Sequence, residues 1–164
     1  MVAEILRALL PSELAAVPPE VPATLLAGRP VLTTGHEHPD ADAVGSALGL
    51  AIALEVLGAR VNTVFADPVP EMYDFMPCVA RITRFQDADL EPDLIVVCDG
   101  DLRRTGAIIS ENATLFERVP NVNIDHHVSN DGTGTISWVD AEAAATCEQM
   151  ALLLPSLGLG FDAA

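Results

Sequence analysis

The chain has 164 residues, the length of a single domain that can bury a core of its own. It carries 24 acidic residues against eight basic ones, all of them arginine, so its net charge is −16. Such a charge repels phosphate at long range and argues against a general role in coating DNA or RNA. A polyanionic substrate would therefore need metal ions, a local group of arginines, or a basic surface on another domain.

The sequence contains no pattern typical of a membrane or secreted protein. Its apolar stretches are interrupted by charge or proline well before the ~20 residues that a membrane span requires. Glu4 stands where a signal peptide would be basic. We therefore expect a cytoplasmic protein without a membrane partner. The three cysteines, Cys78, Cys98 and Cys147, are odd in number and lie in apolar surroundings, which predicts buried free thiols.

The first 29 residues predict a helical segment that packs on the main domain, which we expect to span residues 30–164. Apolar residues recur at helical spacing over 2–10, and Pro11 ends that run. A second short helix is expected over 23–27, with Gly28 as its C-terminal cap. Neither helix carries an obvious reactive group.

From residue 30 onward, predicted strands and helices alternate. Strands are expected over 31–34, 60–66, 93–99, 119–124 and 135–139, with a further short one within 80–85, and helices over 42–57, 107–116 and 141–154. Asp140 is the expected N-cap of the last helix. This alternation predicts an α/β fold with an open, mostly parallel, five-stranded sheet and helices on both faces. Ligands of such sheets bind beyond the carboxyl ends of the strands.

The turn after the first strand carries His36, Asp40 and Asp42 within seven residues, and it leads into the N-terminus of a helix. Two carboxylates and one imidazole suit Mn²⁺, Mg²⁺ or Fe²⁺ better than a metal that prefers thiolates. An alternative interpretation is that Asp42 is only a helix N-cap and His36 only a loop residue. His38 is interpreted as a solvated neighbour.

The turn after the strand at 93–99 offers Asp99 and Asp101. An acidic group at the end of an all-apolar strand needs either a cation or several N–H donors if it is buried. Asp99 could therefore bridge two metal ions. The alternative is an ordinary Asp-Gly-Asp surface turn.

The turn after the strand at 119–124 carries Asp125, His126 and His127. Two adjacent histidines at a strand end cannot both point the same way, so one is free to bind a metal while the other faces a substrate or a supporting acid. A hydrogen-bonded turn continued by residues 129–131 is a reasonable alternative for Asp125. It explains the two histidines poorly.

The combination His36-x-x-x-Asp40-x-Asp42, a later Asp at a strand end and Asp125-His126-His127 resembles the RecJ-like DHH phosphoesterase superfamily, from about residue 30 to the C-terminus. Residues 40–46 and 125–130 are most similar to its bacterial nanoRNase and cyclic-dinucleotide phosphodiesterase branch. Related family II pyrophosphatases share the fold but typically carry Ser at the position of Ala43.

The resemblance implies two metal ions, usually Mn²⁺ with Mg²⁺ as the alternative, that generate a bridging hydroxide. It implies one ion on His36 and Asp40 and the other on Asp42 and His126, with Asp99 bridging both. Asp101 is a second candidate for the bridge. Relatives place an arginine a fixed short distance after the bridging Asp, and the spacing from Asp99 to Arg104 is one residue shorter than that distance.

The remaining roles also follow from the resemblance. His127 would lie near the scissile phosphate and assist the leaving group, supported by Asp125. Arg103 and Arg104 are either phosphate contacts or solvated loop charges, and the sequence does not favour one role over the other. Relatives also carry a fourth metal-binding Asp in a later segment. Asp140 could replace it, although helix capping is the better interpretation.

The resemblance further implies a separate basic domain, DHHA1, that would follow residue 164. We therefore expect an N-terminal catalytic domain with weak or no activity alone, and a homodimer is compatible with it. The leading hypothesis is a metal-dependent phosphodiesterase acting on short oligoribonucleotides, dinucleotides or 3′-phosphoadenosine 5′-phosphate. The alternatives are a pyrophosphatase or exopolyphosphatase, against which Ala43 argues, and a catalytically incomplete nucleotide-binding module.

Overall fold

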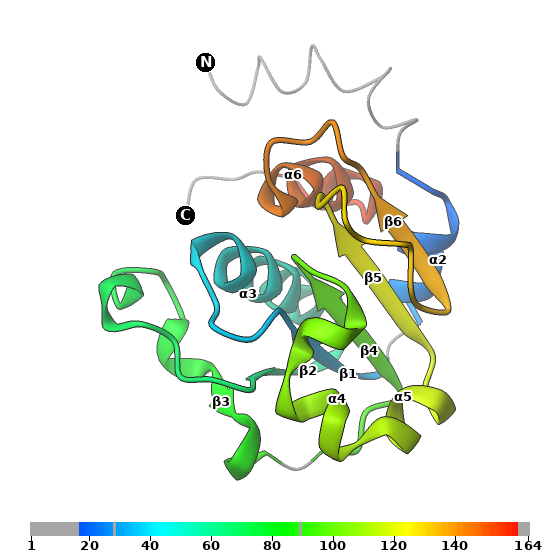
Figure 1. Ribbon diagram of the computed structural model, residues 1–164. Coiled ribbons are helices and arrows are strands. Elements are labelled where there is room, and N and C mark those ends of the chain that lie inside the picture. The colour runs from blue at the N-terminus through cyan, green and yellow to red at the C-terminus, as the bar shows by residue number, and fades with distance from the viewer. Residues whose placement is uncertain (1–16, 28, 89, 161–164) are drawn as a thin grey trace.

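The computed structural model describes residues 17–27, 29–88 and 90–160, and it contains one six-stranded, fully parallel sheet with helices on both faces (Figure 1). The order across the sheet is β3-β2-β1-β4-β5-β6. The strands are β1 Pro30–Thr34, β2 Arg60–Phe65, β3 Thr83–Arg84, β4 Leu94–Cys98, β5 Asn121–Asp125 and β6 Ile136–Val139. The predicted α/β fold is confirmed, and the two-residue β3 adds a sixth strand at one edge.

Two apolar layers enclose the sheet. The helices are α2 Glu20–Leu25, α3 Ala41–Val56, α4 Ala107–Glu111, α5 Ala113–Arg118 and α6 Thr146–Ser156. Side chains of α2, α3 and α6 pack on one face, and side chains of α4 and α5 pack on the other. Alternate residues of β4 serve the two layers, which explains why the Leu94–Cys98 run is apolar throughout and fully buried.

The chain changes direction across the sheet between β1 and β4. From β1 it runs outward through β2 to β3, and then it returns to place β4 on the other side of β1. The connections that leave the carboxyl ends of β1 and β4 therefore diverge, and a crevice opens between them. Residues 35–40 and 99–101 lie at this point.

Helix α6 begins five residues later than predicted, and Asp140 does not cap it. The Asp140 carboxylate instead accepts the backbone N–H of Glu142 at 3.1 Å in a local turn. The helix starts at Thr146, after an Ala145 that has no capping side chain. Its first free N–H groups find their acceptor in Asp42, far away in the sequence.

Two other predicted helices also differ. The helix expected over 107–116 is divided at Asn112, whose side chain donates to the carbonyl of Ile108 and closes the first helix as a short turn. The helix expected over 23–27 lies at Glu20–Leu25, and it buries Val21 and Leu25 against the sheet. The helix expected over 2–10 lies outside the described residues, and so does Gly28, the cap expected for the helix over 23–27.

All three cysteines are free, but only Cys98 is buried as predicted. Cys78 lies in a surface loop with a left-handed backbone, and Cys147 lies in the exposed first turn of α6. Partial burial and the neighbouring Asp42 raise the pKa of Cys147 to about 12, so its thiol keeps its proton at neutral pH. Within the described part of the chain, no helix combines the length and the apolar composition needed to cross a bilayer.

Candidate metal centre

The first turn depends on a close backbone approach at Gly35. A Cβ atom there would lie 2.8 Å from Cε1 of Phe65 and 3.1 Å from the carbonyl oxygen of Cys98. The chain then places the His36 ring in the crevice, where it is almost fully buried. His36 Nδ1 donates to the carbonyl of Glu37 at 2.6 Å, which leaves Nε2 to face the centre of the site.

Asp40, not Asp42, is the N-cap of α3. Its Oδ1 accepts the backbone N–H groups of Asp42 and Ala43 at 3.0 and 3.1 Å. Burial opposes ionisation of Asp40, but these N–H groups and His36 outweigh it, so its pKa lies below the usual value. The alternative interpretation of Asp42 as the cap is therefore wrong. Asp42 lies two residues further along, in the first turn of α3, with Oδ2 3.7 Å from Nε2 of His126.

Asp99 lies at the middle of the site and is 1 % exposed. Its backbone is left-handed, with φ of 60°, so the chain turns sharply as it leaves β4 and aims the carboxylate into the crevice. Oδ2 of Asp99 lies 3.5 Å from Nε2 of His36, and Oδ1 lies 3.5 Å from Nε2 of His126. The two oxygens of one carboxylate thus face two different histidines.

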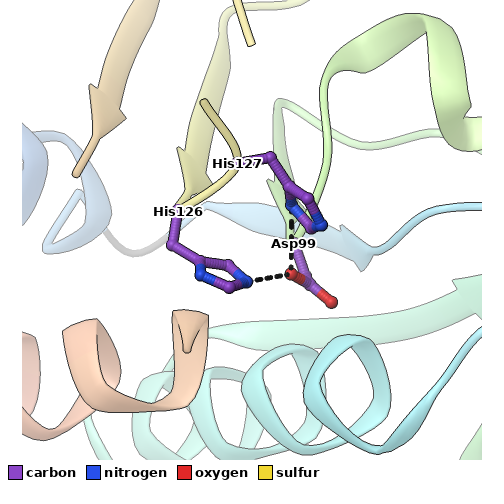
Figure 2. Close-up of side chains that lie close together, drawn as sticks. All are labelled: Asp99, His126 and His127. Atoms are coloured by element: carbon purple, nitrogen blue, oxygen red, sulfur yellow. Dashed lines mark ion pairs between the residues drawn. The ribbon is translucent and has the colours of Figure 1, made fainter. Parts of the chain in front are cut away.

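The two adjacent histidines, which were expected to point in different directions, both approach Oδ1 of Asp99 from the end of β5 (Figure 2). His126 Nδ1 donates to the carbonyl of Ala143 at 3.3 Å, so Nε2 is the nitrogen that faces Asp99. His127 differs, because its Nδ1 donates to the carboxylate of Asp125 at 2.7 Å. His126 therefore presents a lone pair toward Asp99, whereas the nearest nitrogen of His127 is already occupied by a proton.

Asp125 lies beneath these histidines and is fully buried. Its Oδ1 accepts the backbone N–H of His126 and both the backbone and the ring N–H of His127. Burial opposes ionisation, but hydrogen bonds from Asn130 and His127 lower the pKa of Asp125 below its usual value. The hydrogen-bonded turn proposed for Asp125 from the sequence is present, and it orients both histidines.

The donor atoms form two groups that share Asp99. One contains His36, Asp40 and Asp99, and the other contains Asp99, His126 and His127; within each group the donor atoms lie within 4.8 Å of one another. Imidazole nitrogens and carboxylate oxygens suit hard or intermediate divalent cations. Asp99 also raises the pKa of His36 above 6.5 against the effect of burial, so the site already attracts positive charge. The residues therefore fit divalent cations, although neither group contains Asp42 and one of them contains His127.

Asp101 does not lie in either group of donors found among the described residues. Its carboxylate accepts the backbone and side-chain N–H groups of Arg103 at 2.7 to 3.3 Å. The guanidinium of Arg103 also lies 3.6 Å from Asp131, so it links the second and third turns. The Arg104 carbonyl accepts the N–H of Glu37, and its side chain is exposed.

Two supporting side chains were missed in the sequence. Asn123, fully buried in β5, donates to the carbonyl of Gly100 at 2.6 Å and accepts from Asn130, which itself donates to Asp125. A polar residue in a buried strand was the available signal. Thr146 donates its hydroxyl to Asp99 at 3.1 Å. Nothing local in the sequence points to that contact, because it depends on how α6 packs.

Known proteins similar to this chain match most of its length. Two are bifunctional oligoribonuclease and PAP phosphatase NrnA proteins. The Thermus thermophilus protein is 33% identical over 140 residues, and the match covers 82% of this chain and 39% of the relative. The Bacillus subtilis protein is 29% identical over 122 residues, covering 70% of this chain and 34% of the relative. This chain thus spans well under half of their length.

The fold also matches a crystal structure of an exopolyphosphatase-related protein from Bacteroides fragilis. The TM-score is 0.75 at 23% identity, covering 85% of this chain and 43% of that chain. Residues 30–161 match the model of the DHH family, N-terminal domain, which includes every predicted site residue. The chain belongs to the DHH family.

Proposed function

We propose that this chain is the metal-binding domain of a phosphoesterase that hydrolyses the phosphodiester bonds of short oligoribonucleotides and a phosphomonoester of 3′-phosphoadenosine 5′-phosphate. Membership of the DHH family and the names of the two NrnA relatives support the reaction class and the substrates. The chain matches less than half of those relatives, so the proposed activity is that of the intact protein.

One observation carries the proposal: the two oxygens of Asp99 each lie 3.5 Å from Nε2 of a different histidine, His36 or His126. A buried carboxylate in this position is suited to bridge two cations. His36 and Asp40 would hold one ion, and His126 and Asp42 would hold the other. Mn²⁺ is the proposed ion at both places, with Mg²⁺ as the alternative.

Two such ions, when bound, polarise phosphoryl oxygens and lower the pKa of a water molecule. His36 and His126 keep Nε2 available for this, because backbone carbonyls hold Nδ1 of each ring. His127, when both of its ring nitrogens carry a proton, is proposed to give the proton on Nε2 to the leaving oxygen, while Asp125 holds the N–H of Nδ1. Asp125 orients the ring and does not touch the substrate.

The substrate phosphates require more positive charge than this chain provides. The net charge of −16 makes the ions the main attraction for phosphate within the crevice. Arg104 is the better proposed phosphate contact of the two adjacent arginines, because Arg103 is paired with Asp101 and Asp131. We expect a basic surface elsewhere in the intact protein, and therefore weak or no activity from the isolated domain.

The test is release of mononucleotide from a dinucleotide, and of phosphate from 3′-phosphoadenosine 5′-phosphate, by the intact protein with Mn²⁺ and with chelator. We expect both reactions to depend on Mn²⁺ and to be lost in Asp99→Asn. The isolated domain is assayed beside it. Release of orthophosphate from pyrophosphate without cleavage of the dinucleotide would contradict the proposed substrate class, and absence of Mn²⁺ binding would contradict the proposed site.

A further inference from the structure

The first turn of α6 contacts two of the proposed metal ligands from the side opposite β5. The backbone N–H of Thr146 donates to Oδ2 of Asp42 at 2.7 Å, and the N–H of Cys147 donates to Oδ1 at 2.8 Å. The hydroxyl of Thr146 donates to Oδ1 of Asp99 at 3.1 Å. One residue thus holds two carboxylates that come from different strand ends.

The Thr146 contact with Asp99 has no equivalent among the described residues. Thr146 is fully buried, and it is the one uncharged side chain that hydrogen-bonds the Asp99 carboxylate there. Three histidine nitrogens lie 3.5 to 3.6 Å from that carboxylate, and the Asp40 carboxylate also lies close to it. The hydroxyl therefore holds Oδ1 of Asp99, the oxygen that faces His126.

The support that Thr146 provides is one-sided. The oxygen it holds is Oδ1, which faces His126, and the other carboxylate it holds is Asp42, which also lies beside His126. The His36 side has its own supports, because Glu37 holds the His36 ring and the N–H groups of α3 hold Asp40. Loss of the Thr146 hydroxyl would leave those supports in place.

We propose that Thr146 is a positioning residue for the cation on the His126 side of the site: its hydroxyl orients Asp99, and its backbone N–H, which Thr146→Val keeps, orients Asp42. The inference rests on the proposed function, because it presupposes that cations bind there. Supporting contacts of this kind orient ligand atoms without touching the ion, and their removal lowers metal affinity. Thr146 would act through the two carboxylates and need not contact the substrate.

The experiment measures Mn²⁺ binding by the intact protein, by calorimetry and by the electron paramagnetic resonance of free Mn²⁺. Thr146→Val is combined with His36→Ala, a background in which only the cation position on the His126 side remains intact. It is combined separately with His126→Ala, in which only the position on the His36 side remains intact. We expect Thr146→Val to lower affinity about 10- to 100-fold in the first background and less than about threefold in the second. Thr146→Ser, which keeps the hydroxyl, should restore the affinity.

Thr105→Val is the matched control. Thr105 is also fully buried, and its hydroxyl donates at 2.9 Å to the carbonyl of Leu102, so the variant removes a similar bond that supports no carboxylate. Unfolding in chelator reports any general loss of stability. If Thr146→Val does not fold, Thr146→Ala removes the same hydroxyl with less bulk and is compared with Thr146→Ser in the same way.

The outcomes separate the two proposals. Equal losses in both backgrounds, no loss in either, or an equal loss in Thr105→Val would overturn the role of Thr146. The unmodified protein could bind two Mn²⁺ ions and release mononucleotide while Thr146→Val leaves the Mn²⁺ affinity of the His126 side unchanged. That result would overturn the role of Thr146 and leave the proposed function standing. If the unmodified protein binds no Mn²⁺, the proposed function and this inference fail together.

Discussion

The ring of His127 donates from Nδ1 to Oδ1 of Asp125 at 2.7 Å, and the accepting carboxylate is fully buried. A carboxylate whose pKa is lowered accepts hydrogen bonds and does not donate them, so the proton lies on Nδ1. This leaves Nε2 of His127 for another partner. The pair thus distinguishes His127 from His36 and His126, whose Nδ1 atoms face backbone carbonyls.

Asp125→Asn should lower kcat with little effect on Mn²⁺ affinity. The amide can no longer hold the tautomer of His127, and we expect kcat on a dinucleotide to fall about 100-fold, while Mn²⁺ affinity changes less than about tenfold. Asp131→Asn is the control, because it makes the same chemical change at an exposed carboxylate of the same loop. An unchanged kcat in Asp125→Asn would exclude the orienting role.

Asp99→Asn and Asp101→Asn separate the two candidates for the bridging residue. Asp99 lies between His36 and His126, whereas Asp101 is bonded to Arg103. We expect Asp99→Asn to weaken Mn²⁺ binding more than about 100-fold, and Asp101→Asn to change it less than about threefold. Titration followed by electron paramagnetic resonance measures both. The reverse order of effects would move the bridge to Asp101.

The stability that Asp101 provides should depend on pH. Burial opposes ionisation of Asp101, but the side-chain and backbone hydrogen bonds from Arg103 outweigh it, so its pKa in the folded protein lies below 3.8. A lowered pKa gives stability that is present above the unfolded value and lost as pH falls through the folded value. Wild type should therefore exceed Asp101→Asn by about 1 kcal/mol in free energy of unfolding at neutral pH.

Urea unfolding in chelator, at a series of pH values, measures this difference. We expect it to stay constant down to about pH 5 and to shrink as the pH falls below 3.8. A difference that grew on acidification would contradict the assignment of an ionised Asp101 bonded to Arg103.

Gly35→Ala should destabilise the protein, whereas Gly49→Ala should not. The new Cβ at residue 35 would lie 2.8 Å from the ring of Phe65 and 3.0 Å from Cβ of Ala43, both buried. Such overpacking typically costs about 1–3 kcal/mol. At Gly49, inside α3, a Cβ meets nothing within 4 Å, so alanine should add about 0.5–1 kcal/mol of helix propensity. Urea unfolding without metal compares the two, and equal effects would contradict the close packing at Gly35.

The sheet was predicted well from the sequence because the central strands are marked by short, continuous apolar runs. The fully buried run Leu94–Cys98 is aliphatic throughout, as a strand covered on both faces must be. The close approach of the candidate metal ligands was predictable for the same reason. Each follows the end of such a strand, so parallel pairing alone brings Asp99 and His126 to one edge.

The details that were not predictable depend on contacts between distant segments. Helix α6 begins at Thr146 because Asp42 accepts its first N–H groups from 104 residues away, while Asp140 had appeared to be the natural cap. The choice of Asp40 over Asp42 as the cap of α3 follows from a backbone turn that spacing alone does not specify. Arg103 likewise selects Asp101 through a loop geometry that the sequence leaves open.

The bond between Asp42 and the start of α6 has a consequence for how the protein is made. During synthesis the N-terminal part of a chain leaves the ribosome first. The turn that holds His36, Asp40 and Asp42 therefore emerges before Thr146 and Cys147, which donate to Asp42, have been synthesised. An unfinished chain that stops before Thr146 would carry the whole His-x-x-x-Asp-x-Asp turn and Asp-His-His, yet lack the contact that joins Asp42 to Asp99. The site can therefore be completed only after α6 has docked, and the proposed cations would bind only once the sheet is assembled.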